Sequence, residues 1–201
     1  MGIIAYTQRV HIVESYNERR DCIDQRIPLF LKECGFTSIA LPNVKDIVRS
    51  ILNEVKVDGI VLTGGNSLVK YGGDAPERDC VDNFLIEYCL DNGIPIYGIC
   101  RGMQSLLDFF SVELVEVNNH VAVKHRIYDV DNKLIRITNS FHNQGAFFIK
   151  EPLKIIAKSD DGIIEAIENK EQKILGTMWH PEREKPYLLE DINMVKNFFG
   201  I

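Results

Sequence analysis

The pattern of apolar and polar positions divides the chain into two regions. In the first two thirds, short apolar runs alternate with stretches whose apolar residues recur every three or four positions, the spacing of a helix face. This pattern predicts strands at residues 3–6, 37–41, 59–63 and 94–99, and helices at residues 26–34, 44–55, 79–89 and 103–110. Because strands and helices alternate, we expect parallel strands joined by right-handed crossovers, with helices on both faces of the sheet.

The last third has a different pattern, in which short strands follow one another directly. We predict strands at residues 112–117, 120–123, 134–137, 147–150, 155–157, 163–168 and 174–178, and a final helix at residues 188–199. Strands in direct succession are typical of antiparallel pairing. The prediction is a three-layer, flavodoxin-like α/β fold with a mostly parallel central sheet, helices on both faces and a small antiparallel sheet from the last third. Residues 1–201 contain no linker, so we expect a single domain.

Composition narrows the classes of partner and location. Of the 201 residues, 45% are hydrophobic, enough for a core, and the formal net charge is −6. An acidic chain argues against nucleic acid as a partner, whereas a nucleotide-sized substrate needs only a few local arginines. The first residues do not resemble a signal peptide, and no apolar run is long enough to span a membrane. Five cysteines without a CxxC pair indicate neither a disulfide framework nor a zinc site, and favour a reducing, cytoplasmic setting.

The segment around Cys100 has the pattern of a nucleophile elbow. An apolar run at residues 94–97 precedes it and a helical pattern follows, so the cysteine falls at a strand–turn–helix junction. Gly98 and Gly102 remove side chains where the strand and the helix crowd together. The helix N-terminus beneath Cys100 favours an anion, and hence the nucleophilic thiolate. A buried core cysteine beside a tight turn is the alternative interpretation.

The sequence also offers a base and an oxyanion site for this nucleophile. Pro181 favours extended geometry at His180, so Glu182, two residues further on, is expected to face the same side and to orient the imidazole. Gly64 and Gly65 follow a buried strand, where the lack of side chains lets a backbone N–H approach a ligand. Taken singly, these residues have ordinary alternatives: a core or surface histidine, a solvated carboxylate and a plain turn.

Five segments together resemble the class I, or triad, glutamine amidotransferases, and within them the gamma-glutamyl hydrolase branch. They span nearly the whole chain in the order typical of that family. The segments are Leu62-Thr63-Gly64-Gly65, Pro76-Glu77-Arg78-Asp79, Gly98-Ile99-Cys100-Arg101-Gly102-Met103-Gln104, Ser140-Phe141-His142-Asn143-Gln144 and Trp179-His180-Pro181-Glu182. The resemblance implies a cysteine-dependent hydrolase that cleaves a gamma-glutamyl amide bond and releases glutamate, with neither cofactor nor metal.

The resemblance implies a catalytic role for each matching residue. Cys100 would be the nucleophile, His180 the acid and base, and Glu182 the residue that orients His180. The backbone amides of Gly65 and Arg101 would form the oxyanion hole.

Further positions are implied as substrate-binding residues: Gly64, Gln104, His142, Asn143 and Arg78. Asn143 stands where many relatives have a second histidine, which leaves the contact made by this loop open. Arg78 is either a substrate contact or a surface arginine at a helix start. The other histidines, His11, His120, His125 and His142, lack the spacing of metal ligands, and we expect His120 and His125 to be structural or to line the pocket.

The leaving half of the substrate is the open question. Residues 5–9 and 15–21 resemble bacterial hydrolases of capsule biosynthesis that release glutamate from a nucleotide-linked gamma-glutamyl amide, leaving a cytidine diphosphoramidate. Arg19 and Arg20 would then suit a diphosphate, although a solvated, charged helix start is the alternative. The competing functions are hydrolysis of another gamma-glutamyl amine such as gamma-glutamyl-GABA, a glutaminase subunit that passes ammonia to a synthetase, and a non-catalytic binding module.

Overall fold

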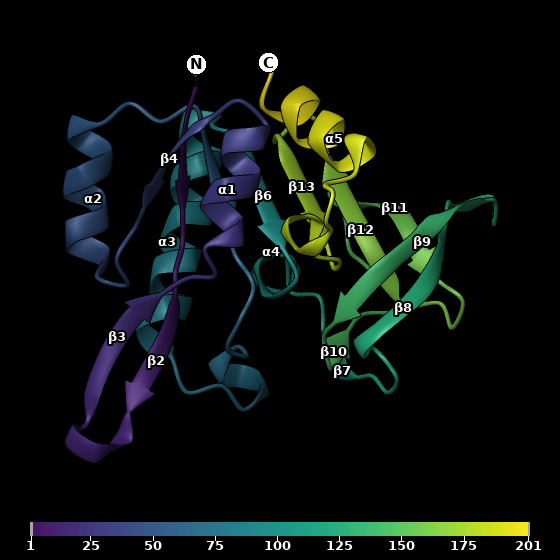
Figure 1. Ribbon diagram of the computed structural model, residues 1–201, viewed down its shortest axis with the longest axis horizontal. Coiled ribbons are helices and arrows are strands. Elements are labelled where there is room, and N and C mark those ends of the chain that lie inside the picture. Colours follow the sequence, from purple (N-terminus) through teal and green to yellow (C-terminus); the bar gives the residue numbers. More distant parts are fainter. Residues whose placement is uncertain (1, 201) are drawn as a thin grey trace.

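The computed structural model describes residues 2–200, which are built around a nine-stranded sheet (Figure 1). The strands lie in the order β4-β1-β5-β6-β13-β12-β11-β8-β9. Their bounds are Ile3–Tyr6 for β1, Thr37–Ala40 for β4, Gly59–Leu62 for β5, Ile96–Ile99 for β6, Val121–Tyr128 for β8, Leu134–Phe141 for β9, Lys154–Ser159 for β11, Ile164–Asn169 for β12 and Ile174–Thr177 for β13. From β4 to β13 neighbouring strands pair parallel, and from β13 to β9 they pair antiparallel.

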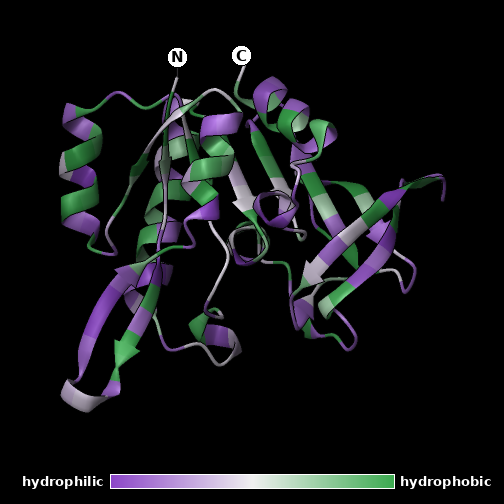
Figure 2. Ribbon diagram, in the orientation of Figure 1, coloured by the Kyte–Doolittle hydropathy of each residue, from purple (hydrophilic) through white to green (hydrophobic). Residues whose placement is uncertain are grey.

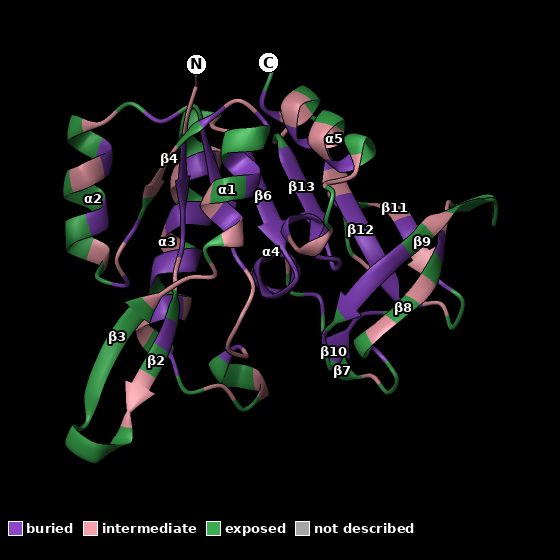
Figure 3. Cartoon of the chain, in the orientation of Figure 1, coloured by how far each residue is buried: buried purple, intermediate pink, exposed green. Residues whose placement is uncertain are grey.

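Helices cover both faces of the parallel half. On one face, α2 (Lys45–Glu54), α3 (Pro76–Asn92) and α4 (Arg101–Phe109) contribute to one apolar cluster with the sheet. On the other face, α1 (Arg26–Glu33) and α5 (Leu189–Phe199) contribute to a second cluster. Every residue of β5 and β6 is buried, as expected for parallel strands covered on both sides. Figure 3 shows β6 in the colour of buried residues. The predicted three-layer α/β fold is confirmed.

Two predicted helices begin earlier than their apolar periodicity indicated. α3 starts at Pro76 rather than at residue 79, because proline at the first helical position has no N–H that needs an intrahelical partner. It ends before Gly93, whose φ of 62° is left-handed. α4 starts at Arg101, directly after Cys100. Within residues 2–200, no helix has both the length and the apolar character required to cross a membrane.

The strands of the last third extend the central sheet, and a two-stranded sheet of β7 (Val115–Glu116) and β10 (Gln144–Gly145) lies beside them. The strand predicted at residues 147–150 is wrong, because that segment is irregular. Its apolar residues suggested a buried strand, yet Phe148 is 82% exposed. Apolar character without a neighbouring strand to pair with does not make a strand.

The sequence pattern missed an antiparallel hairpin near the N-terminus. It consists of β2 (Arg9–Val13) and β3 (Glu18–Cys22), joined by the short 3-10 helix Glu14–Tyr16, and it projects from the body of the molecule (Figure 1). β3 is polar and largely exposed, so it lacks the apolar alternation that predicts a strand (Figure 2). The hairpin begins directly after β1 and therefore lies at the carboxyl end of that strand.

Candidate active site

Cys100 lies at the turn between β6 and α4, in a strained backbone conformation. Its φ of 51° and ψ of −106° lie outside the regions that residues with side chains normally occupy. The flanking glycines permit this turn: a Cβ on Gly98 would overlap the backbone of Gly102, and a Cβ on Gly102 would overlap the carbonyl group of Leu62. The turn places Cys100 at the N-terminus of α4, where free backbone N–H groups favour an anion.

His180 follows β13, the neighbour of β6 in the sheet, and is held on several sides. Its Nδ1 lies 2.7 Å from Oε1 of Glu182, and both side chains are buried. Asn139 on β9 fixes the His180 backbone, accepting a hydrogen bond from its N–H and donating one to its carbonyl, each at 2.9 Å. The ring of Phe141 packs edge-on against the imidazole at 5.7 Å between centroids. With Nδ1 bound to Glu182, Nε2 is the ring nitrogen left for chemistry.

Cys100 and His180 meet at Gly64. A Cβ on Gly64 would lie 2.8 Å from Cε1 and 3.6 Å from Nε2 of His180, and 3.6 Å from Cβ of Cys100. Although burial opposes the charged ring, the Cys100 sulfur and then the Glu182 carboxylate outweigh it and raise the pKa of His180 to about 9. At neutral pH the imidazole is therefore protonated when it faces a thiolate.

Arg78 holds the loop that carries Gly64 and Gly65 through hydrogen bonds to its backbone. This side chain is fully buried, and its guanidinium donates to the carbonyls of Thr63 at 2.6 Å and Gly64 at 3.1 Å, and also to the carbonyl of Gly65. Gly65 itself has a φ of 91°, which favours glycine. Burial, with a smaller effect of the Arg101 charge, lowers the pKa of Arg78 to about 9, so it stays charged at neutral pH. The surface-arginine alternative is wrong, and Arg78 positions the loop.

The other predicted oxyanion residue, Arg101, is anchored through its side chain. Its guanidinium is 1% exposed and forms ion pairs with Asp82 and Asp79 on α3. Ser105 completes the cluster, donating to Oδ2 of Asp82 at 2.9 Å. The side chain of Arg101 therefore points into the protein, and its backbone amide, at the first turn of α4, is the group left to face Cys100.

The motif at residues 140–144 separates into buried and exposed positions. His142 is buried, with Nδ1 bound to the Gln144 carbonyl at 3.0 Å and Nε2 facing Nδ1 of His120 at 3.3 Å, so the predicted substrate contact of His142 is corrected. Asn143 is exposed, and its carbonyl accepts from Val117 N–H at 2.9 Å. Gln104 is buried and donates to the Gln144 carbonyl at 3.0 Å, which joins α4 to this loop.

Arg19 and Arg20 lie on the exposed strand β3 of the hairpin, so the helix-start alternative is wrong. Arg19 is paired with Glu77 at the start of α3 at 2.6 Å, and it also donates to the Asp74 carbonyl at 2.8 Å. Arg20 pairs with Glu18 on its own strand at 2.5 Å. Arg19 thus ties the hairpin to α3, whereas Arg20 points along the hairpin surface.

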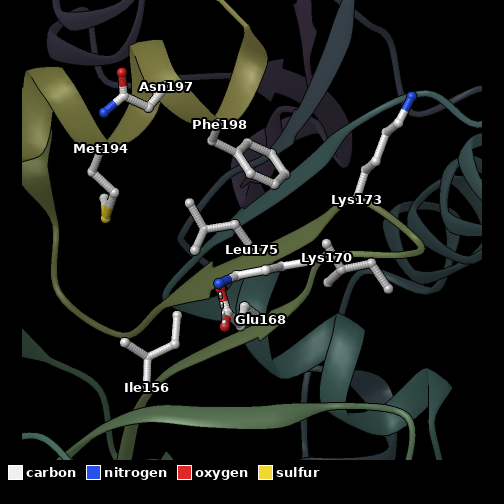
Figure 4. A pocket seen from close by; sticks show the side chains of 9 residues that line it. Ile156, Glu168, Lys170, Lys173, Leu175, Met194, Asn197 and Phe198 are labelled. Atoms are coloured by element: carbon white, nitrogen blue, oxygen red, sulfur yellow. Dashed lines mark ion pairs between the residues drawn. The ribbon is translucent and has the colours of Figure 1, made fainter.

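A small cavity of about 30 Å³ lies beside His180, and residues that were not among the predicted site residues line part of it. Arg9, Asp24 and Arg183 line it together with Gly65 and His180. Arg9 ends the segment at residues 5–9 that carries the narrower resemblance, but no role was predicted for it, and no motif marks Asp24 or Arg183. The three residues come from β2, the segment after β3 and the turn after His180. A larger cavity of about 480 Å³ lies between α5 and the sheet, where Leu175, Met194 and Phe198 line it (Figure 4). Leu175 belongs to the start of β13, so that cavity lies away from the chemistry at the other end of this strand.

The chain belongs to the class I glutamine amidotransferase family, whose model matches residues 20–200. It is 33% identical to a gamma-glutamyl-CDP-amidate hydrolase of Campylobacter jejuni over 201 residues, which cover 98% of each protein. It is 32% identical to a gamma-glutamyl-gamma-aminobutyrate hydrolase of Escherichia coli over 187 residues, covering 74% of this chain and 73% of the relative.

A solved structure shows the same fold. It is that of a candidate GMP synthase component from Thermoplasma acidophilum, with a TM-score of 0.74 and 21% sequence identity. The match covers 100% of this chain and 94% of the other. At this level of identity the likeness concerns the arrangement of the strands and helices.

Proposed function

We propose that the chain is a cysteine-dependent hydrolase that cleaves a gamma-glutamyl amide bond and releases glutamate. The observation that carries this proposal is the meeting of Cys100, at a strained elbow, with an imidazole that Glu182 orients at 2.7 Å. A core cysteine needs neither the strained turn nor a buried histidine–carboxylate pair beside it. The similarity to two gamma-glutamyl hydrolases supports the same class of reaction.

In the proposed reaction, the Cys100 thiolate attacks the gamma-carbonyl carbon, and the oxyanion that forms accepts hydrogen bonds from the amides of Gly65 and Arg101. As the carbon–nitrogen bond breaks, the His180 imidazolium gives its proton to the leaving nitrogen. Water then attacks the thioester while His180 removes a proton from it. Cleavage of the carbon–sulfur bond releases glutamate and restores the thiolate and the imidazolium.

The test of this mechanism is glutamate release by the purified chain. Cys100→Ala should abolish release, while Cys80→Ala, at an exposed cysteine outside the site, should leave it unchanged. Equal turnover by the wild type and Cys100→Ala would remove the mechanism. If the wild-type chain acts on glutamine alone, and strongly only with a synthetase partner, it is a glutaminase subunit instead.

For the half of the substrate that leaves with the amide nitrogen, we propose a nucleoside diphosphate group, as in the substrate named for the Campylobacter relative. Two arginines at the cavity beside His180 support an anionic group there. A Cβ on Gly65 would lie 2.9 Å from Cδ of Arg9, so this arginine borders the proposed oxyanion loop. The guanidinium of Arg183 lies over the Phe141 ring at 4.1 Å, next to the triad. Both are better placed than Arg19, which Glu77 already holds.

A substrate panel tests this assignment. The purified chain is given gamma-glutamyl-CDP-amidate, glutamine and gamma-glutamyl-GABA, and kcat/KM is compared. Arg9→Ala and Arg183→Ala should raise KM roughly tenfold or more for the nucleotide substrate and much less for glutamine, because each removes a charge-assisted bond to phosphate. Arg49→Ala, at an exposed arginine on α2 that does not line the cavity, is the matched control. A preference for gamma-glutamyl-GABA, or equal effects of Arg9→Ala on all three substrates, would refute the diphosphate contact.

A further inference from the structure

Three histidines and a glutamate gather in the antiparallel half of the sheet, outside the proposed reaction. His120 precedes β8, His125 lies on β8, His142 follows β9 and Glu165 lies on β12. The carboxylate of Glu165 is completely buried, and His120 and His142 are 3% and 2% exposed. A buried carboxylate is costly unless a cation or hydrogen-bond donors compensate it.

Outer hydrogen bonds fix which ring nitrogens face the centre of this cluster. Nε2 of His120 lies 2.9 Å from Asp161, so it carries the proton and donates to that carboxylate. Nδ1 of His142 lies 3.0 Å from the Gln144 carbonyl, which accepts its proton. In the neutral rings, Nδ1 of His120 and Nε2 of His142 are therefore bare, and each presents a lone pair to the interior.

These two nitrogens and one carboxylate oxygen form a nearly equilateral triangle. The nitrogens of His120 and His142 are 3.3 Å apart, and Oε1 of Glu165 lies 3.5 Å from the first and 3.3 Å from the second. Neither Oε atom of Glu165 has a hydrogen-bond partner with good geometry. Three groups that present lone pairs to one another repel unless a positive charge lies between them.

The triangle has the dimensions of one face of a zinc site. Zinc–nitrogen and zinc–oxygen bonds of about 2.0–2.1 Å in a tetrahedron place neighbouring ligand atoms roughly 3.3–3.4 Å apart. Asp161 and the Gln144 carbonyl bind the outer ring nitrogens, as the outer hydrogen-bond partners of metal-bound histidines do. His125 adds a further donor, with Nε2 at 3.4 Å from Oε2 of Glu165, and His120, His125 and Glu165 each offer an atom within 4.8 Å of the others.

We propose that His120, His142 and Glu165 bind a divalent transition metal of the zinc type, with His125 as a fourth donor at its edge. The metal would join β8, β12 and the loop after β9. That loop directly follows β9, whose Asn139 holds the His180 backbone. The metal would therefore stabilise a segment that positions His180. The sequence concealed the site because its donors come from separate strands rather than from one short motif.

The competing occupant is a proton, which would make one histidine cationic and satisfy the same geometry without metal. To distinguish the two, the chain is stripped with a chelator, incubated with Zn²⁺ or Co²⁺ alone, and dialysed. We expect about one metal per chain by elemental analysis, visible Co²⁺ absorption of a four-coordinate site, and a melting temperature raised by roughly 5 °C or more at saturating Zn²⁺. A chain that takes up neither ion overturns the proposal.

Variants locate the site if metal is bound. Glu165→Gln should remove binding, and Asp161→Asn, at a side chain that is half exposed and tolerant of change, should weaken Zn²⁺ affinity roughly 10–100-fold by freeing the His120 ring. His11→Asn, on the exposed hairpin, is the matched control and should bind as the wild type does. Unchanged affinity in Asp161→Asn, or loss of the metal in His11→Asn, would place the metal elsewhere and overturn the assignment.

Discussion

Replacing Gly64 by alanine should damage catalysis while leaving the fold intact. The added Cβ would lie 2.8 Å from Cε1 of His180, whereas carbon atoms in contact stay about 3.5–4.0 Å apart. The ring or the loop must therefore move by about 1 Å. The ring is fixed by Glu182 at 2.7 Å, and the loop by the Arg78 guanidinium at 2.6 Å from the Thr63 carbonyl. Neither the His180 ring nor the loop can move this far without breaking a buried hydrogen bond.

The size of the effect follows from this displacement. A misplacement of about 1 Å at a reacting group costs roughly 100-fold in rate, or about 2.7 kcal/mol of transition-state stabilisation. We therefore expect kcat/KM for glutamate release to fall roughly 100-fold in Gly64→Ala, mostly through kcat. Alkylation of Cys100 should slow as well, because the displaced imidazolium stabilises the thiolate less.

Gly93→Ala is the control for a general effect of adding a methyl group. Gly93 ends α3 with a φ of 62°, and no atom lies within 4 Å of the added Cβ. Alanine there costs about 1–2 kcal/mol of backbone strain, so the melting temperature should fall by roughly 2–8 °C with kcat/KM unchanged. If Gly64→Ala keeps kcat/KM within about threefold of the wild type at an unchanged melting temperature, the reasoning about His180 is refuted.

Two other changes test the residues that hold the site. Glu182→Gln should move the alkaline limb of kcat/KM down from about pH 9 by roughly 1–3 units, because the lost carboxylate helps keep the His180 acid protonated; an unmoved limb in the pH–rate profile would contradict this role. Arg78→Met should lower the free energy of unfolding by roughly 3 kcal/mol or more in urea titration, because the carbonyls of Thr63, Gly64 and Gly65 lose a buried donor. It should also lower kcat more than it raises KM, and a stable variant with wild-type kcat would show that Arg78 does not position the loop.

The parts of the fold that the sequence predicted are those whose burial fixes their pattern. β5 and β6 are buried on both sides and read as continuous apolar runs, and the helices between strands keep one apolar face. β3 is exposed, so nothing in its composition separates it from a loop, and the hairpin went unpredicted. Arg9 belongs to that hairpin and lines the cavity beside His180. Because the hairpin was not predicted, its contribution to this cavity was not predicted either.

In the candidate site, too, the sequence predicted the residues that are marked by their neighbours in the chain, and it did not predict contacts between distant segments. Cys100, His180 and Glu182 are marked by their immediate neighbours, and the structure brings all three together. The surroundings of His142 and Arg78 depend on partners far away in the chain, which a motif does not describe. His142 matched a pocket motif, yet its ring faces Glu165, and Arg78 matched a helix start, yet it reaches back to the loop after β5.

Those distant partners give α3 a role that its sequence does not suggest. Its Arg78 holds the carbonyls around Gly65, while Asp79 and Asp82 hold the side chain of Arg101, so one helix positions both amides of the proposed oxyanion hole. Burying the ion pairs of Arg101 with Asp79 and Asp82 brings little net stability, since apolar residues of similar size often replace a buried ion pair without loss. We infer that the cluster is kept for geometry. β5 and β6 lie side by side and parallel, so their carboxyl ends deliver the two amides to one place, and α3 fixes both before the oxyanion forms.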